Sequence, residues 1–80
     1  MDMGVAVKKR MLDLCVQKQM SINDLEKLCS LSPSSIKNIL YRKSKNPRIL
    51  TIKKICDGLG ITLGEFFSTP EFDELEQEIK

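Results

Sequence analysis

Two short amphipathic segments stand close together between residues 20 and 40, and this pairing constrains the fold more than any other feature of the chain. Ser21 precedes the first segment, with Asp24 three residues later, and Ser32 precedes the second, with Pro33 directly after it. Both patterns are typical of helix starts, because a serine hydroxyl accepts a bond from a free backbone N–H and proline lacks the N–H that would stay unpaired. The residues expected to face inward are Leu25, Leu28 and Cys29 in the first segment and Ile36, Ile39 and Leu40 in the second. We therefore predict two packed helices joined by a tight turn.

Apolar residues at helical spacing predict three further helices of the same bundle. A helix over residues 5–18 turns Val7, Met11, Leu14 and Cys15 inward, and a smaller stripe of Val5, Leu12 and Val16 widens this face or receives another helix. A helix from Ile49 or Leu50 to Leu59 turns Ile52, Ile55, Cys56 and Leu59 inward and ends at Gly60. A short helix after Thr62, whose capping box is completed by Glu65, closes the core with Ile61, Leu63, Phe66 and Phe67. The predicted fold is an all-α bundle of five helices, with a loop over residues 42–48.

The last eleven residues differ in character from the rest of the chain. After Thr69-Pro70, the residues Phe72, Leu75 and Ile79 recur at helical spacing among five acids. We predict a short acidic amphipathic helix, and a division into a domain of residues 1–69 and a tail of residues 70–80. The tail is a candidate dimer element, with two alternatives: it lies along the basic surface of its own domain, or it covers its own core.

The formal net charge of +2 conceals a strong asymmetry along the chain. Residues 1–70 hold twelve Lys or Arg against six Asp or Glu, a balance of +6, whereas residues 71–80 hold one Lys against five acids, a balance of −4. Seven basic residues and no acid lie between Lys37 and Lys54. A positive surface of this extent favours a polyanionic partner, of which nucleic acid is the usual one.

The cysteine pattern and the missing residue types argue against an enzyme. Cys15, Cys29 and Cys56 are odd in number, widely spaced and placed at apolar helix positions, so we expect buried thiols in a reducing cytoplasm and neither disulfides nor a metal site. There is no histidine, glycine-rich phosphate loop or paired carboxylate to support catalysis, and we predict no catalytic residues and no cofactor or small-molecule ligand. The start has no signal-peptide pattern, and no apolar stretch is long enough to cross a membrane.

Residues 5–67 resemble the Cro/C1-type (Xre-family) helix-turn-helix domain of bacterial and phage repressors, the lambda-repressor-like fold. The five buried positions of that motif are filled here by Leu25, Cys29, Leu31, Ile36 and Ile39, and residues 46–67 resemble its fourth and fifth helices. Three positions depart from the family pattern. Glu26 replaces a small residue, Ser30 replaces the glycine of the turn, and Ile22 replaces a glutamine that contacts phosphate.

The resemblance implies that residues 32–40 form the recognition helix, which lies in the DNA major groove. By their match to the family, the residues that reach base edges are Ser32, Ser34, Lys37 and Asn38. Contacts to the DNA backbone or the minor groove fall to Asn23, Ser35, Tyr41, Arg42, Lys43, Lys45 and Arg48. The implied protein is a cytoplasmic transcriptional regulator of bacterial or phage origin, a repressor that binds double-stranded DNA as a homodimer. The alternative is an antitoxin-like module whose main partner is a protein, which only residues 70–80 could grip.

Overall fold

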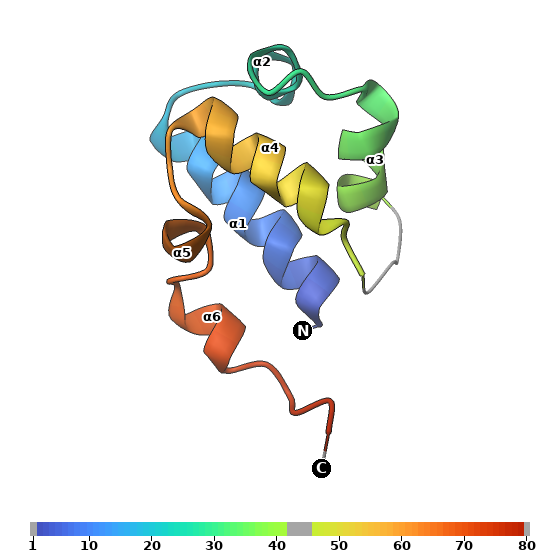
Figure 1. The fold of residues 1–80 in the computed structure, drawn as a ribbon, viewed down its shortest axis with the longest axis vertical. Helices are drawn as coiled ribbons and strands as arrows, with labels where there is room; N and C mark the ends of the chain where they lie inside the picture. Colours follow the sequence, from blue (N-terminus) through green and yellow to red (C-terminus); the bar gives the residue numbers. More distant parts are fainter. Residues whose placement is uncertain (1, 42–45, 80) are drawn as a thin grey trace.

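Figure 1 shows the chain as a computed structural model, which describes residues 2–41 and 46–79. All regular structure in these residues is helical, which confirms the predicted all-α bundle. The helices are α1 (Met3–Gln17), α2 (Ile22–Leu28), α3 (Pro33–Tyr41), α4 (Ile49–Leu59), α5 (Leu63–Phe66) and α6 (Pro70–Asp73). α1 and α4 cross the centre of the molecule, α2 lies over one end of it, and α3 stands at its outer edge (Figure 1).

The helix ends follow the capping residues of the sequence. Ser21 and Asp24 form the predicted reciprocal box at the start of α2: Ser21 N donates to Asp24 Oδ2 at 3.0 Å, and Asp24 N donates to Ser21 Oγ at 3.1 Å. The bond from Ser21 N lowers the pKa of the Asp24 carboxyl. Thr62 forms the equivalent box with Glu65 at the start of α5. Gly60 ends α4 with φ +71°, a left-handed backbone that glycine adopts without strain. α1 begins two residues earlier than predicted, because Asp2 Oδ1 accepts a hydrogen bond from Val5 N at 2.9 Å.

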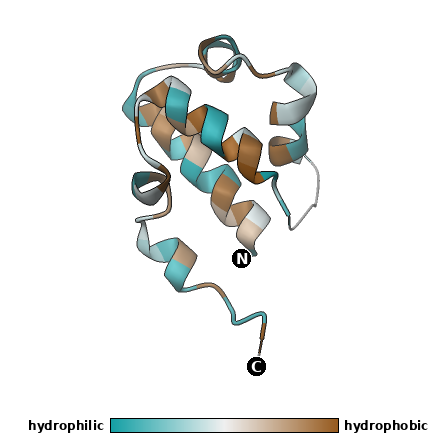
Figure 2. Ribbon diagram, viewed as in Figure 1, coloured by the Kyte–Doolittle hydropathy of each residue, from teal (hydrophilic) through white to brown (hydrophobic). Residues whose placement is uncertain are grey.

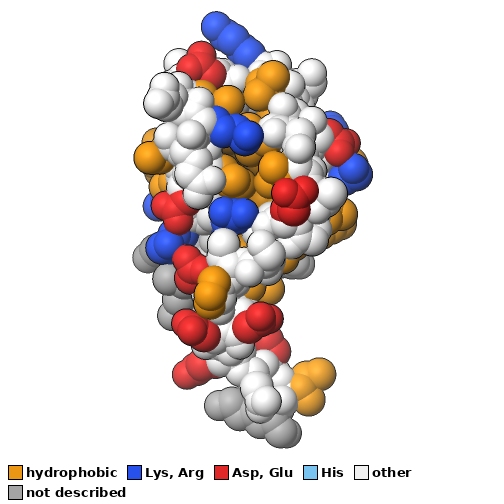
Figure 3. Space-filling model, turned by 90° about the vertical axis from the view of Figure 1, so that its left-hand side faces the viewer, with side chains coloured by type: hydrophobic (Ala, Val, Ile, Leu, Met, Phe, Trp, Pro, Cys, Tyr) orange, Lys and Arg blue, Asp and Glu red, His pale blue; other side chains and the backbone are white. Residues whose placement is uncertain are grey.

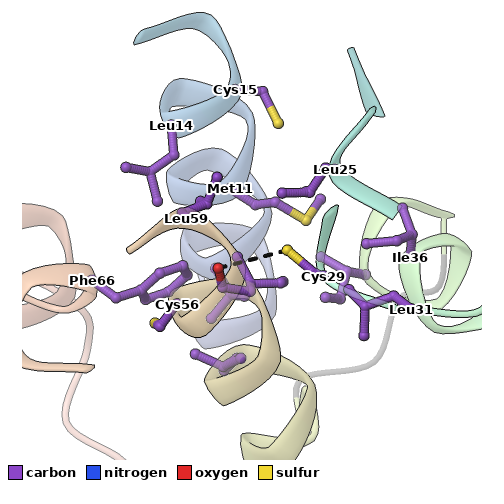
Figure 4. Packing of buried hydrophobic residues seen from close by; sticks show 14 residues of the cluster. Met11, Leu14, Cys15, Leu25, Cys29, Leu31, Ile36, Cys56, Leu59 and Phe66 are labelled. Atoms are coloured by element: carbon purple, nitrogen blue, oxygen red, sulfur yellow. Dashed lines mark hydrogen bonds between the residues drawn. The ribbon is translucent and has the colours of Figure 1, made fainter. Parts of the chain in front are cut away.

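The apolar stripes of the helices meet in one core, whose packing Figure 4 shows. All the predicted inward residues of α1 and α4 are buried, and so are the five buried positions of the helix-turn-helix pattern. Colouring by hydropathy shows brown bands on the sides of α1 and α4, with teal residues between them (Figure 2). The fold-defining part of the sequence pattern is therefore confirmed.

Three apolar residues lie outside this core, contrary to the sequence prediction. Leu28 is 51% exposed, because the buried stripe of α2 runs through Leu25 and Cys29 and leaves the neighbouring position turned to the side. Val5 and Val16 are 47% and 77% exposed, since the described helices pack on the opposite side of α1. The second stripe of that helix therefore does not widen the core at these two positions.

The side chain of Arg10 ties α1 to the end of α5. Its Nε donates to the carbonyl of Phe66 at 2.8 Å, and its Nη2 donates to the carbonyl of Glu65 at 2.9 Å. These carbonyls belong to the last turn of a short helix, where no further turn of helix supplies a donor. The carbonyl of Glu65 also accepts from Ser68 Oγ at 2.8 Å, so Arg10 and Ser68 together satisfy the end of α5, and Arg10 holds it against the bundle.

The start of the C-terminal segment packs on its own domain. Phe72 forms an aromatic cluster with Phe66 and Phe67, at ring-centre distances of 6.2 and 4.9 Å. Lys9 Nζ lies 2.9 Å from Glu71 Oε1 and 3.0 Å from Asp13 Oδ2, and it lowers the pKa of the Glu71 carboxyl to about 2. An apolar contact and an ion pair therefore both dock α6 on the bundle.

Beyond α6 the predicted helix does not continue to Ile79. The helix ends at Asp73, and Ile79 is 90% exposed. The segment leads away from the bundle at the opposite end of the long axis from α2 and α3 (Figure 1), and acidic side chains gather around it (Figure 3). A helix there would bring acids together at i, i+3 and i+4 with no basic residue among 71–79 to offset their repulsion, so the observed helix is short.

Candidate nucleic-acid interface

One face of α3 is buried in the core and the opposite face is exposed to solvent. Ile36 and Ile39 are buried, while Ser34, Lys37 and Asn38 on the same helix are exposed. Proline occupies its first position, as predicted, where its missing N–H leaves no donor unpaired. α3 stands at the outer edge of the bundle in Figure 1, and the exposure of these three side chains shows that its polar face is accessible.

The turn before α3 has a left-handed backbone at Ser30, although this position holds serine and not glycine. Ser30 adopts φ +52°, the left-handed region that glycine occupies more easily. Leu31 N donates to the carbonyl of Glu26 at 3.0 Å and closes the end of α2. Glu26 is half-buried, so its carboxylate reaches solvent beside the turn. The chain thus makes the turn without glycine, at a backbone cost on the order of 1 kcal/mol.

Close packing between Cys29 and Gly58 fixes α2 against α4. A methyl group placed on Gly58 would lie 2.3 Å from Cys29 Sγ and 3.1 Å from its Cα, so only glycine allows this approach. The thiol donates to the carbonyl of Ile55 at 3.7 Å, as Figure 4 shows. Burial raises the pKa of this thiol and of those of Cys15 and Cys56, which keeps all three neutral.

Three serine hydroxyls form a hydrogen-bonded group at the start of α3. Ser32 Oγ lies 3.0 Å from Ser34 Oγ and 3.0 Å from Ser35 Oγ. Ser35 N donates to the Ser32 carbonyl at 3.1 Å and to Ser32 Oγ at 3.3 Å. Ser32 is therefore the N-cap that its position predicted, and it also links the hydroxyl of the exposed Ser34 with that of the half-buried Ser35.

A polar cavity of about 460 Å³ opens between the first half of α3 and the start of α4. It is lined by Ser32, Ser34, Ser35, Asn38, Ile39, Asn46, Pro47, Arg48 and Thr51. The structure thus brings together three residues predicted to contact bases, Ser32, Ser34 and Asn38, and two predicted to contact the DNA backbone, Ser35 and Arg48. Asn46 and Thr51 were not singled out from the sequence, although both lie within three residues of Arg48, which was.

The other predicted contact residues are more scattered. Lys37 and Tyr41 are exposed on α3, outside the cavity lining, and Asn23 is exposed near the start of α2. Arg42, Lys43 and Lys45 lie outside the described residues.

The described basic residues between Lys37 and Lys54 differ in their surroundings. Lys53 pairs with Asp57 one turn later, and this bond raises the pKa of the lysine. Lys37, Arg48 and Lys54 are exposed. Among residues 2–41 and 46–79 there is no group of three His, Cys, Asp or Glu that could hold a metal ion, and no helix is long and apolar enough to span a bilayer.

Comparison with known protein families decides what this helix pair belongs to. A sequence profile of the Cro/C1-type HTH DNA-binding domain matches residues 10–71. The chain belongs to this Cro/C1-type family. It is therefore a helix-turn-helix DNA-binding domain, and the resemblance seen in the sequence is confirmed.

Individual relatives agree with the family assignment. The HTH-type transcriptional regulator PuuR of Escherichia coli (strain K12) and that of Shigella flexneri are each 36% identical over 70 residues. The matched region is 88% of this chain but 37% of each relative, so the chain spans just over a third of their length. The crystal structure of the prophage Lp1 protein 11 superposes with a TM-score of 0.82 at 33% identity, covering 94% of this chain and 100% of that one.

Proposed function

We propose that this domain binds specific sequences of double-stranded DNA as a homodimer and represses transcription, with α3 in the major groove. The observation that carries the proposal is the two-sided character of α3. Its apolar face is buried in the bundle, while Ser34, Lys37 and Asn38 point to solvent beside a polar cavity. A helix that protrudes in this way, flanked by a basic run, suits the major groove.

Base reading falls to the exposed side chains of α3. Asn38 can pair in bidentate fashion with adenine, and Lys37 can donate to the O6 and N7 atoms of guanine. Ser34 is short and reads fewer features of a base edge. Ser32 is matched to a base-reading position of the family as well, but its hydroxyl already serves two neighbours.

Backbone contacts surround these base contacts. Arg48 and Ser35 line the cavity from its two sides, where a phosphate would neutralise the arginine and accept from the hydroxyl. Arg48 also follows Pro47, a placement from which it could enter a narrow minor groove. The remaining proposed backbone contacts are Asn23, Tyr41, Arg42, Lys43 and Lys45.

Size is the reason for proposing a homodimer. A single module of this size buries little surface on DNA and binds weakly by itself, so two copies on half-sites about one helical turn apart would supply affinity and symmetry. The PuuR relatives are named as transcriptional regulators, which supports a regulatory role for this chain.

The antitoxin-like alternative has less support. It needs residues 70–80 to offer an apolar segment to a partner. Phe72 is instead packed against Phe66 and Phe67, and Leu75 is half-buried, which leaves Ile79 as the exposed large apolar residue of that segment. We therefore favour DNA as the main partner.

Selection of bound duplexes from a random pool, with the full chain, tests the proposal. We expect an enriched palindrome. Asn38→Ala should change base preference at one position, whereas Lys43→Ala should weaken all sequences alike and lower the salt slope by about 0.9 on a log–log plot. Lys9→Ala is the charge-matched control, because Lys9 pairs with Glu71 of α6, and α6 lies toward the opposite end of the long axis from α3 (Figure 1). Failure to enrich any sequence at low ionic strength would refute specific binding.

Light scattering tests the dimer separately. We expect the mass of two copies on the selected duplex, and a chain ending at Thr69 shows whether the tail contributes. An asymmetric site carrying one copy would refute the homodimer while leaving DNA binding intact.

A further inference from the structure

The hydrogen-bonding capacity of Ser32 is fully used within the protein. A hydroxyl has one proton to donate and two lone pairs that accept. Ser35 N takes one lone pair at 3.3 Å. The remaining lone pair and the proton serve the hydroxyls of Ser34 and Ser35, each 3.0 Å away. Nothing is left for a base edge, so Ser32 acts as a positioning residue for its two neighbours.

Only two proton arrangements satisfy this group. In the first, Ser34 donates to Ser32 and Ser32 donates to Ser35, which leaves the Ser35 proton free. In the second, Ser35 donates to Ser32 and Ser32 donates to Ser34, which leaves the Ser34 proton free. The outward behaviour of the two hydroxyls is therefore coupled through Ser32: when one can donate to a ligand, the other can only accept.

DNA selects one of these arrangements. A phosphate oxygen accepts hydrogen bonds and cannot donate, so a Ser35 hydroxyl on phosphate requires the first arrangement. The half-buried Ser35 lines the cavity with Arg48, and the exposed Ser34 lies closer to the outer face of α3. Ser34 then offers lone pairs alone to the base beside it. In the major groove, donors to such an acceptor are the exocyclic amines of adenine and cytosine, whereas guanine and thymine present acceptors.

We infer that Ser32 is the hub of a hydroxyl relay through which the phosphate contact of Ser35 makes Ser34 select adenine or cytosine on the contacted strand. This inference rests on the proposed docking of α3 in the major groove. It gives Ser34 a specificity that a lone serine lacks, because an isolated hydroxyl rotates to suit either a donor or an acceptor.

The test begins with selected sites for the full chain and its Ser34→Ala variant, which identify the base that Ser34 contacts. We expect adenine or cytosine there. Replacing a contacted adenine by purine, which lacks the amine, should weaken binding of the wild-type protein about tenfold and leave the affinity of Ser34→Ala unchanged. A contacted guanine or thymine would overturn the inference.

Ser35→Ala separates the relay from ordinary contacts. Without the Ser35 hydroxyl, the Ser32 proton can pass to Ser34, which is then free to donate. Discrimination between the amine-bearing and keto bases should fall about tenfold at this position alone, whereas loss of the phosphate contact by itself would weaken all sequences equally. Ser32→Ala should also lose the discrimination and Ser32→Thr should keep it.

The readout is a ratio of affinities of one variant for two duplexes, so a partly unfolded variant does not disturb it. Unchanged discrimination in Ser35→Ala would overturn the relay. If Asn38→Ala still alters the preference for the base that Asn38 contacts, the proposed function stands without the relay. A wild-type chain that prefers no sequence removes the proposed function itself.

Discussion

Replacing Gly58 by alanine should change the free energy of unfolding through two effects of opposite sign. Gly58 lies inside α4, where alanine would stabilise a helix by about 1 kcal/mol. The new methyl carbon, however, would stand 2.3 Å from Cys29 Sγ and 3.1 Å from its Cα. Carbon and sulfur need about 3.5 Å or more, and the backbone atom cannot rotate away as a side chain can.

Overpacking of a core typically costs about 1–3 kcal/mol, which exceeds the gain in helix propensity. We therefore expect Gly58→Ala to lower the free energy of unfolding by about 1 kcal/mol. With a urea slope of about 1 kcal/mol/M for a domain this small, the midpoint of urea unfolding should fall by about 1 M. DNA affinity should fall as well, because α2 would be pushed from α4 and would carry the turn before α3 with it.

Two further variants make this reasoning refutable. Gly64→Ala is the matched control: its methyl would meet nothing closer than Thr62 Oγ1 at 3.8 Å, so the midpoint should stay unchanged or rise. In a Cys29→Ala background the 2.3 Å contact is absent, and adding the Gly58→Ala methyl should cost at least about 1 kcal/mol less than in the wild type. A Gly58→Ala protein with a higher urea midpoint than the wild type would show that the contact is not tight.

Three other perturbations follow from contacts described above. Arg10→Met should lower the free energy of unfolding by about 1–3 kcal/mol, because the part-buried carbonyl of Phe66 loses its side-chain donor, whereas the carbonyl of Glu65 keeps the Ser68 hydroxyl. Thermal unfolding measures this loss, and a change below about 0.5 kcal/mol would contradict the role of Arg10. Thr62→Ala should cost about 1 kcal/mol by removing a helix cap, as followed by circular dichroism on heating, and no loss would mean that the reciprocal box is not formed in solution. Lys9 lowers the folded-state pKa of Glu71 from 4.5 to about 2. Glu71→Gln should therefore be less stable than the wild type above about pH 4.5, and this difference should shrink as the pH falls toward about 2. Urea unfolding between pH 2 and 7 checks this, and a constant difference over that range would exclude the ion pair as its source.

Local patterns predicted the part of the fold that short-range chemistry controls. The box of Ser21 and Asp24, the left-handed Gly60 and the buried pair of Leu25 and Cys29 depend on spacing within a helix or at its end, which the sequence displays directly. Leu28 was wrongly placed inside, because spacing alone does not say on which side of a wide apolar stripe the neighbouring helix packs.

Features that depend on the meeting of distant segments escaped prediction. The contact of Cys29 with Gly58 joins residues 29 positions apart, and Arg10 reaches carbonyls more than 50 residues away. Neither has a local signature. For the candidate site, the sequence named the serines at the start of α3 but could not tell which hydroxyls meet, because that depends on side-chain rotamers.

The direction in which the last residues leave the bundle has a practical consequence. Because they depart from the end of the long axis opposite α3 (Figure 1), a fluorophore or affinity handle attached there would stand clear of α3. Immobilising the protein through that end would leave the exposed face of α3 open to solution, whereas coupling through an amine such as that of Lys37 would obstruct it.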